Sequence, residues 1–79
     1  MDSPGAPVAL DATGLTCPQP VLMLATGLAS VAVGETVVLT ATDPTSKVDV
    51  PVWCRRHRQQ LTDVSGNDTV FVFTVVRAQ

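Results

Sequence analysis

Two segments of the chain alternate between apolar residues on one side and threonine or valine on the other, a spacing typical of β-strands. Side chains in a strand point in turn to opposite faces, so residues two apart share a face. Residues 35–42 and 69–76 both show this period. The predicted core-facing residues are Val37, Leu39 and Ala41 in the first segment and Phe71, Phe73 and Val75 in the second. Each segment therefore has one face for the core and one that faces away.

Shorter signals predict two further strands and a turn. Residues 8–12 read Val-Ala-Leu-Asp-Ala, and residues 61–64 form a weaker strand-like run. The Ser-Gly-Asn-Asp sequence at residues 65–68 is typical of the turn between antiparallel strands. We expect residues 61–76 to form a hairpin.

The apolar stretch of residues 21–33 predicts a helix. Its apolar residues recur at three- and four-residue steps, which places them in one stripe. The stripe consists of Val21, Leu24, Ala25, Leu28, Ala29 and Ala32. Pro18 and Pro20 fit the first turn, where a missing N–H costs nothing. Gly34 is expected to end this segment.

A second helix is expected between the turn at residues 43–46 and about residue 60. The turn carries Asp, Thr and Ser, which cap helices well. The predicted core stripe is Val50, Trp53, Cys54 and His57, continuing to Leu61. Pro51 leaves two alternatives: the helix begins near Asp49, or it begins near Ser46 and bends at Pro51.

The predicted order of elements is β-α-β-α-β-β. A right-handed crossover makes the first two strands parallel, while the last two form an antiparallel pair. Two helices on one face of a four-stranded mixed sheet give a two-layer α/β (α+β) sandwich. We expect residues 1–6 to form a flexible tail and residues 7–79 a single domain.

Composition narrows the functional classes. A chain of 79 residues with 46% hydrophobic residues supports one small core. The net charge of −2 argues against nucleic-acid binding, and we interpret residues 55–58 (Arg-Arg-His-Arg) as a solvated helix face rather than a docking patch. We see no secretion signal and no apolar run of membrane-spanning length. Two cysteines are too few for a secreted disulfide framework, so a reducing cytoplasm is the expected compartment.

Cys17 is the candidate reactive residue. It lies where a loop leads into the first helix, and we expect it at the N-cap of that helix. Unpaired backbone N–H groups and the helix dipole would lower the pKa of a thiol there and stabilise a persulfide anion. The alternative, a small buried cysteine, is disfavoured because Cys17 lies outside the apolar stripe.

Around Cys17 the sequence resembles the cysteine-proline-x-proline signature of the TusA/SirA family. The motif occupies residues 14–21, with Gly14, Leu15, Pro18 and Pro20 as supporting residues. Three further segments match in order: Val-Gly-Glu-Thr at 33–36, Ala-Thr-Asp-Pro at 41–44 and Asp-Val-Pro-Val-Trp-Cys at 49–54. The resemblance covers roughly residues 8–77.

This resemblance implies a sulfurtransferase-type carrier that acts through a nucleophilic cysteine. Cys17 would accept sulfane sulfur as a persulfide from a cysteine desulfurase or a rhodanese-type donor and relay it to an acceptor protein. The pathways that it implies are tRNA thiolation, molybdenum-cofactor maturation and sulfur metabolism. Thiol exchange requires no cofactor and no metal. The alternative is a regulatory or protein-binding module on the same fold, without sulfur transfer.

Other residues have weaker claims to a role in the chemistry. We interpret Cys54 as a packing residue, since a resolving role needs its Cα within about 7 Å of that of Cys17. A metal site formed by Cys17, Cys54 and His57 is disfavoured because paired Cys-x-x-Cys spacing is absent. Asp43 is expected near Cys17, because strand ends and helix starts share one edge in parallel α/β units. The candidate partner contacts are Asp43, Leu22 and Met23.

The outward face of the sheet is predicted to be uncharged. It comprises Thr36, Val38, Thr40, Thr42, Val70, Val72, Thr74 and Val76. Monomers rarely expose a large apolar patch without a use. We therefore expect weak self-association, or a partner that docks on this face.

Overall fold

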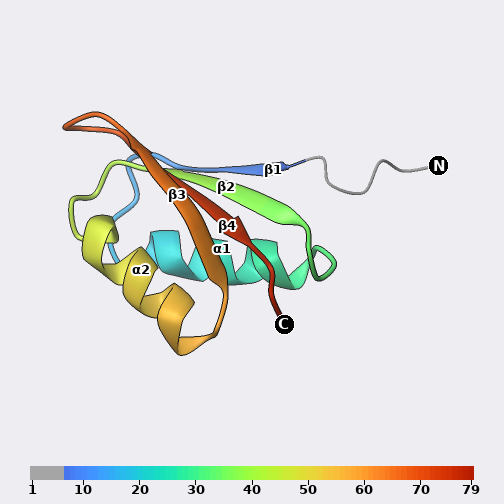
Figure 1. Ribbon diagram of the computed structural model, residues 1–79. Coiled ribbons are helices and arrows are strands. Elements are labelled where there is room, and N and C mark those ends of the chain that lie inside the picture. Colours follow the sequence, from blue (N-terminus) through green and yellow to red (C-terminus); the bar gives the residue numbers. More distant parts are fainter. Residues whose placement is uncertain (1–6) are drawn as a thin grey trace.

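The computed structural model describes residues 7–79 and contains four strands and two helices in the predicted order (Figure 1). The elements are β1 (Val8–Ala12), α1 (Gln19–Ala29), β2 (Thr36–Ala41), α2 (Ser46–Arg56), β3 (Gln60–Gly66) and β4 (Phe71–Val76). The predicted tail, residues 1–6, lies outside the described residues.

The strands form one mixed sheet in the order β1-β2-β4-β3. Strand β1 runs parallel to β2, and β4 is antiparallel to both β2 and β3. Both helices lie on the same side of this sheet (Figure 1). The predicted two-layer sandwich is therefore confirmed.

The faces of the sheet also follow the prediction. All six predicted core-facing residues are buried: Val37, Leu39, Ala41, Phe71, Phe73 and Val75. The eight residues predicted to face outward are all half-buried. Across the outward face, valine pairs with threonine, as in Val38 with Thr74 and Thr40 with Val72. This open face is free of charge across its two central strands.

Helix α1 is shorter than the apolar periodicity predicts. It ends at Ala29, where Ser30 donates a hydrogen bond from Oγ to the carbonyl of Gly27 over 2.7 Å. A serine that bonds back to the preceding turn competes with helix continuation. The chain then turns Val31 into the core and leaves Ala32 exposed. The last part of the predicted stripe is therefore wrong.

Helix α2 begins at Ser46 and includes Pro51, which decides between the two predicted starts. Val50 and Cys54 are buried, as expected. The helix ends at Arg56, however, so His57 caps it and is exposed instead of lying in the core. The predicted core stripe does not reach His57 because the chain turns at Arg58, which has a positive φ of 55°, and then enters β3.

Three loops lie together at one end of the sheet because the strand ends there are aligned. Ala12 pairs with Ala41, Ala41 with Phe71, and Phe71 with Gly66, so these four residues form one row. Beyond this row lie the β1–α1 loop, the β2–α2 loop and the β3–β4 hairpin (Figure 1). Cys17 belongs to the first of these loops and Asp43 to the second.

Candidate functional site

Cys17 lies in the turn that joins β1 to α1. The N-cap residue of α1 is Pro18 and the helix begins at Gln19, so the predicted N-cap position for Cys17 is wrong by one residue. The turn is closed by the N–H of Gln19, which donates to the carbonyl of Thr16 over 2.9 Å. Cys17 is half-buried, which leaves part of its surface open to another molecule.

The supporting motif residues shape this turn. Gly14 has a φ of +78°, a region that favours glycine, and its N–H donates to the Thr42 Oγ1 over 2.9 Å. Leu15 packs against the core and donates its N–H to the carbonyl of Ala12 over 3.1 Å. Pro20 is fully buried in the first turn of α1. The turn is therefore anchored on both sides of Cys17.

Two carboxylates from distant parts of the chain contact Cys17. Asp43 accepts the Cys17 backbone N–H on Oδ2 over 2.7 Å, as expected from the shared edge. Its Oδ1 accepts the N–H of Thr45 over 3.1 Å. The bond from Cys17, and then that from Thr45, lower the pKa of Asp43. Asp49, in the first turn of α2, accepts a hydrogen bond from the Cys17 thiol on Oδ2.

The thiol of Cys17 is less acidic than an ordinary cysteine, contrary to the prediction. The hydrogen bond to Asp49 is the main cause that raises its pKa to about 11, followed by desolvation and by the charges of Asp49 and Asp43. A negative acceptor stabilises the protonated thiol over the thiolate.

Two backbone N–H groups next to the sulfur already have other acceptors. That of Cys17 binds Asp43 and that of Gln19 binds Thr16, while Pro18 and Pro20 have none.

Asp49 is the residue that sequence reasoning missed. It lies within a segment that matches the family, but no role was assigned to it. The signal that could have found it is its place in the first turn of α2, at the sheet edge that also holds Cys17. Its sequence separation from Cys17 is 32 residues, so only the packing of α2 beside α1 brings the two side chains together.

A cavity of about 200 Å³ borders the Cys17 site, between the start of α1 and one side of α2. Pro18 and Val21 line one wall. The other wall comes from α2 and its end: Asp49, Val52, Trp53, Arg56 and His57. This cavity is apolar in the middle, acidic beside Cys17 and basic at its far end. Leu22 is 59% exposed and Met23 packs against the core, and their role as partner contacts stays a prediction.

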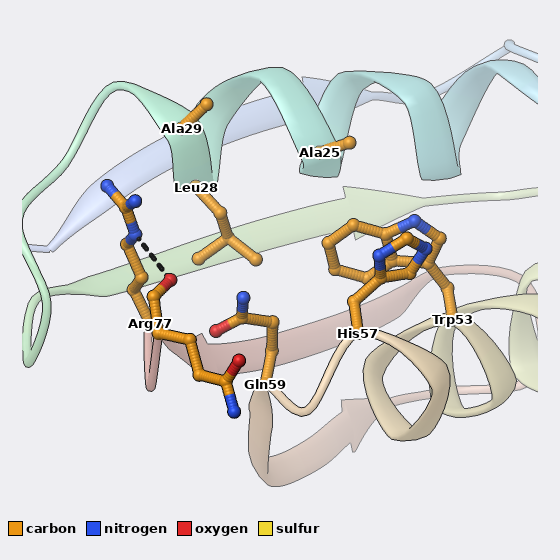
Figure 2. Close-up of a pocket in the computed structure, with 8 residues that line it drawn as sticks. Ala25, Leu28, Ala29, Trp53, His57, Gln59 and Arg77 are labelled. Atoms are coloured by element: carbon orange, nitrogen blue, oxygen red, sulfur yellow. Dashed lines mark hydrogen bonds between the residues drawn. The ribbon is translucent and has the colours of Figure 1, made fainter.

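A larger cavity of about 250 Å³ lies farther along the two helices and is lined by neither Pro18 nor Asp49, the neighbours of Cys17 (Figure 2). His57 stacks on Trp53 there, with ring centroids 4.5 Å apart. Arg77 is held across the opening by carbonyls, donating from Nε to Gln79 over 2.9 Å and from Nη1 to Val31. Among the described residues, no cysteine, serine or threonine lines this cavity.

Cys54 is a packing residue, as predicted. It is 2% exposed, and burial raises the pKa of its thiol to about 11. Both cysteines are free. Within residues 7–79, no three His, Cys, Asp or Glu side chains gather in a way that could hold a metal ion. Neither of the two helices in this range is long enough to cross a membrane.

Fold and site together define a small two-layer α/β protein with one accessible cysteine at a helix start. A family model described as Sulfurtransferase TusA matches residues 8–77. The chain therefore belongs to the TusA family.

Relatives named as sulfur carriers support this membership. The chain is 49% identical over 45 residues to the sulfur carrier protein TusA of Pseudomonas putida strain W619; the match covers 57% of this chain and 56% of that protein. It is 35% identical over 66 residues to the protein of that name from Pseudomonas putida strain F1, covering 84% of this chain and 82% of the relative.

A solved structure has the same fold. The crystal structure of a SirA-like protein from Desulfitobacterium hafniense superposes with a TM-score of 0.79. The match covers 91% of this chain and 99% of that chain, at 22% sequence identity.

Proposed function

We propose that this protein carries sulfane sulfur as a persulfide on Cys17. It would take the sulfur from a donor persulfide and pass it to an acceptor protein. The observation that carries this proposal is the contrast between the two cysteines. Cys17 is half-buried in a loop at the sheet edge, whereas Cys54 is 2% exposed in the core.

The proposed reaction is an exchange between a thiol and a persulfide. The sulfur of Cys17 attacks the outer sulfur of the donor persulfide, R–S–SH, and the donor S–S bond breaks. Cys17 becomes Cys17–S–SH and the donor leaves as R–SH, so the proton lost by the Cys17 thiol is balanced by the proton gained by the donor thiolate. The persulfide of the donor is reduced to a thiol, and the thiol of Cys17 is oxidised to a persulfide. The second transfer repeats these steps with Cys17 as the donor.

The surroundings of Cys17 suit an exchange between two proteins. A persulfide extends the side chain by one S–S bond, about 2 Å, and so moves the reacting sulfur outward from the turn. The neighbouring cavity offers apolar walls from Val21 and Val52, and a partner loop that carries a cysteine could dock there. Desolvation by such a partner would keep water away from the transferred sulfur.

The donor is proposed to be a cysteine desulfurase or a rhodanese-type protein, and the reaction to occur in a reducing cytoplasm. The acceptor is proposed to belong to tRNA thiolation, molybdenum-cofactor maturation or sulfur metabolism. These proposals rest on family membership. The geometry around Cys17 suits any of these donors and acceptors equally.

Mass spectrometry after incubation with a cysteine desulfurase and cysteine tests the proposal. The expected gain is about 32 Da, one sulfur atom, on the peptide that contains Cys17. Cys17→Ala should lose this gain, while the matched control Cys54→Ala should keep it. Normal loading of Cys17→Ala would refute the proposal. Absence of loading in the wild-type protein, together with stable binding of the desulfurase, would favour the non-catalytic binding module instead.

A further inference from the structure

The carboxylate of Asp49 contacts the sulfur that the proposed reaction uses. Its Oδ2 accepts the hydrogen bond of the Cys17 thiol. The same turn is held from the other side by Asp43, which binds the Cys17 N–H. The thiol proton therefore lies between Cys17 and a group that favours the protonated form of the sulfur.

The charges that shift the pKa of the Cys17 thiol are those of the carboxylates Asp49 and Asp43. Helix α1 carries no charged residue, and the carboxylate of Asp11 at the end of β1 is bonded to Thr13. The β2–α2 loop contributes Asp43, and the first turn of α2 contributes Asp49. Lys47 is in the same turn, and its Nζ lies over the ring of Phe71, 5.1 Å from the centroid. The cationic Arg56 and the neighbouring His57 stand at the other end of the α1–α2 cavity, beyond Val52 and Trp53.

We propose that Asp49 holds Cys17 as a neutral thiol in the idle protein, and that sulfur uptake begins when a docking partner moves this carboxylate off the sulfur. The consequence for sulfur uptake rests on the proposed function, but the effect on the thiol does not. Thiolate is the nucleophile in persulfide exchange and also the form that is oxidised, so a protonated Cys17 is protected between transfers.

The size of the effect follows from the acidity of the thiol. An ordinary cysteine with a pKa of 9.0 is a few per cent thiolate at pH 7.5. With its pKa raised to about 11, first by the bond to Asp49 and then by desolvation and the charges of Asp49 and Asp43, Cys17 would hold about 100-fold less thiolate at that pH. Simple alkylating reagents cannot displace Asp49 as a protein partner does, so they report this idle state.

Alkylation by iodoacetamide across pH 6–10 tests the proposal, with Cys17 modification followed by peptide mass. In the wild-type protein we expect the rate to rise about tenfold per pH unit without a plateau through pH 9.5. Asp49→Asn keeps the shape of the side chain but not its charge. In this variant the pH midpoint of the alkylation curve should fall by about one pH unit or more. The rate at pH 7.5 should then rise at least about tenfold. Asp63→Asn, an exposed carboxylate on β3, is the matched control and should follow the wild-type curve.

Two results would overturn this role for Asp49. One is a wild-type plateau at or below about pH 8.5, the ordinary range for cysteine. The other is an Asp49→Asn curve that coincides with the wild-type curve while circular dichroism shows a folded protein. If Asp49→Asn does not fold, the position of the plateau in the wild-type alkylation curve alone decides whether the proposal stands.

The alkylation assay needs no sulfur donor. A raised midpoint in a protein that never loads sulfur would therefore refute the proposed function and leave the role of Asp49 intact.

Discussion

Gly66 closes the β3–β4 hairpin at the sheet edge that also carries Cys17, and its replacement by alanine should destabilise the fold. Its φ is +111°, a backbone angle that residues with a side chain rarely adopt. A Cβ at this position would lie 2.1 Å from the carbonyl oxygen of Val70, which is part of the backbone and cannot rotate away. That oxygen also accepts the N–H of Asn67 over 2.8 Å.

The expected cost combines two effects. Forcing an L-residue into a positive φ costs about 1–2 kcal/mol, and moving the Val70 carbonyl gives up a hydrogen bond that contributes about 1 kcal/mol. Alanine also reduces the freedom of the unfolded chain, which offsets about 0.4–1 kcal/mol. We expect Gly66→Ala to lower the free energy of unfolding by about 2 kcal/mol. For a domain of this size, Tm would fall by about 8–16 °C.

Urea and thermal unfolding followed by circular dichroism provide the measurement. Gly34→Ala is the matched control, because Gly34 also has a positive φ, +93°, but its Cβ would meet nothing within 4 Å. The control should lose about 1 kcal/mol, from the backbone effect alone. If Gly66→Ala loses no more stability than Gly34→Ala, the close contact with Val70 does not matter and the reasoning fails.

Two further predictions concern the second cysteine and the open face of the sheet. Cys54→Ala should lower the free energy of unfolding by about 1 kcal/mol or somewhat more while Cys17 still loads sulfur; lost transfer at unchanged stability would indicate a resolving role. The wild-type protein should self-associate weakly in sedimentation experiments at rising concentration. Val72→Lys on the open face should abolish the self-association, whereas Val48→Lys on the exposed side of α2 should not. A wild-type protein that stays strictly monomeric at millimolar concentration would refute the predicted self-association.

Local patterns were enough to predict the architecture. Alternation in β2 and β4 identified the buried face, because a strand has only two sides and Phe71 and Phe73 must face the helices. Boundaries were less well predicted. The apolar pattern runs on past Ala29, but Ser30 bonds back to Gly27 and ends the helix. His57 has the spacing of a core residue, yet α2 ends one residue before it.

For the site, the sequence by itself identified the candidate reactive residue. Cys17 stands in a distinctive motif at a helix start, outside the apolar stripe, and both properties are local. Only the tertiary structure decided the acidity of its thiol. Asp43 and Asp49 are 26 and 32 residues away along the chain, and the packing of α2 beside α1 brings their carboxylates to Cys17. A pKa depends on the charges within a few ångströms, so the helix-start rule predicted a lower value and the two carboxylates reversed it.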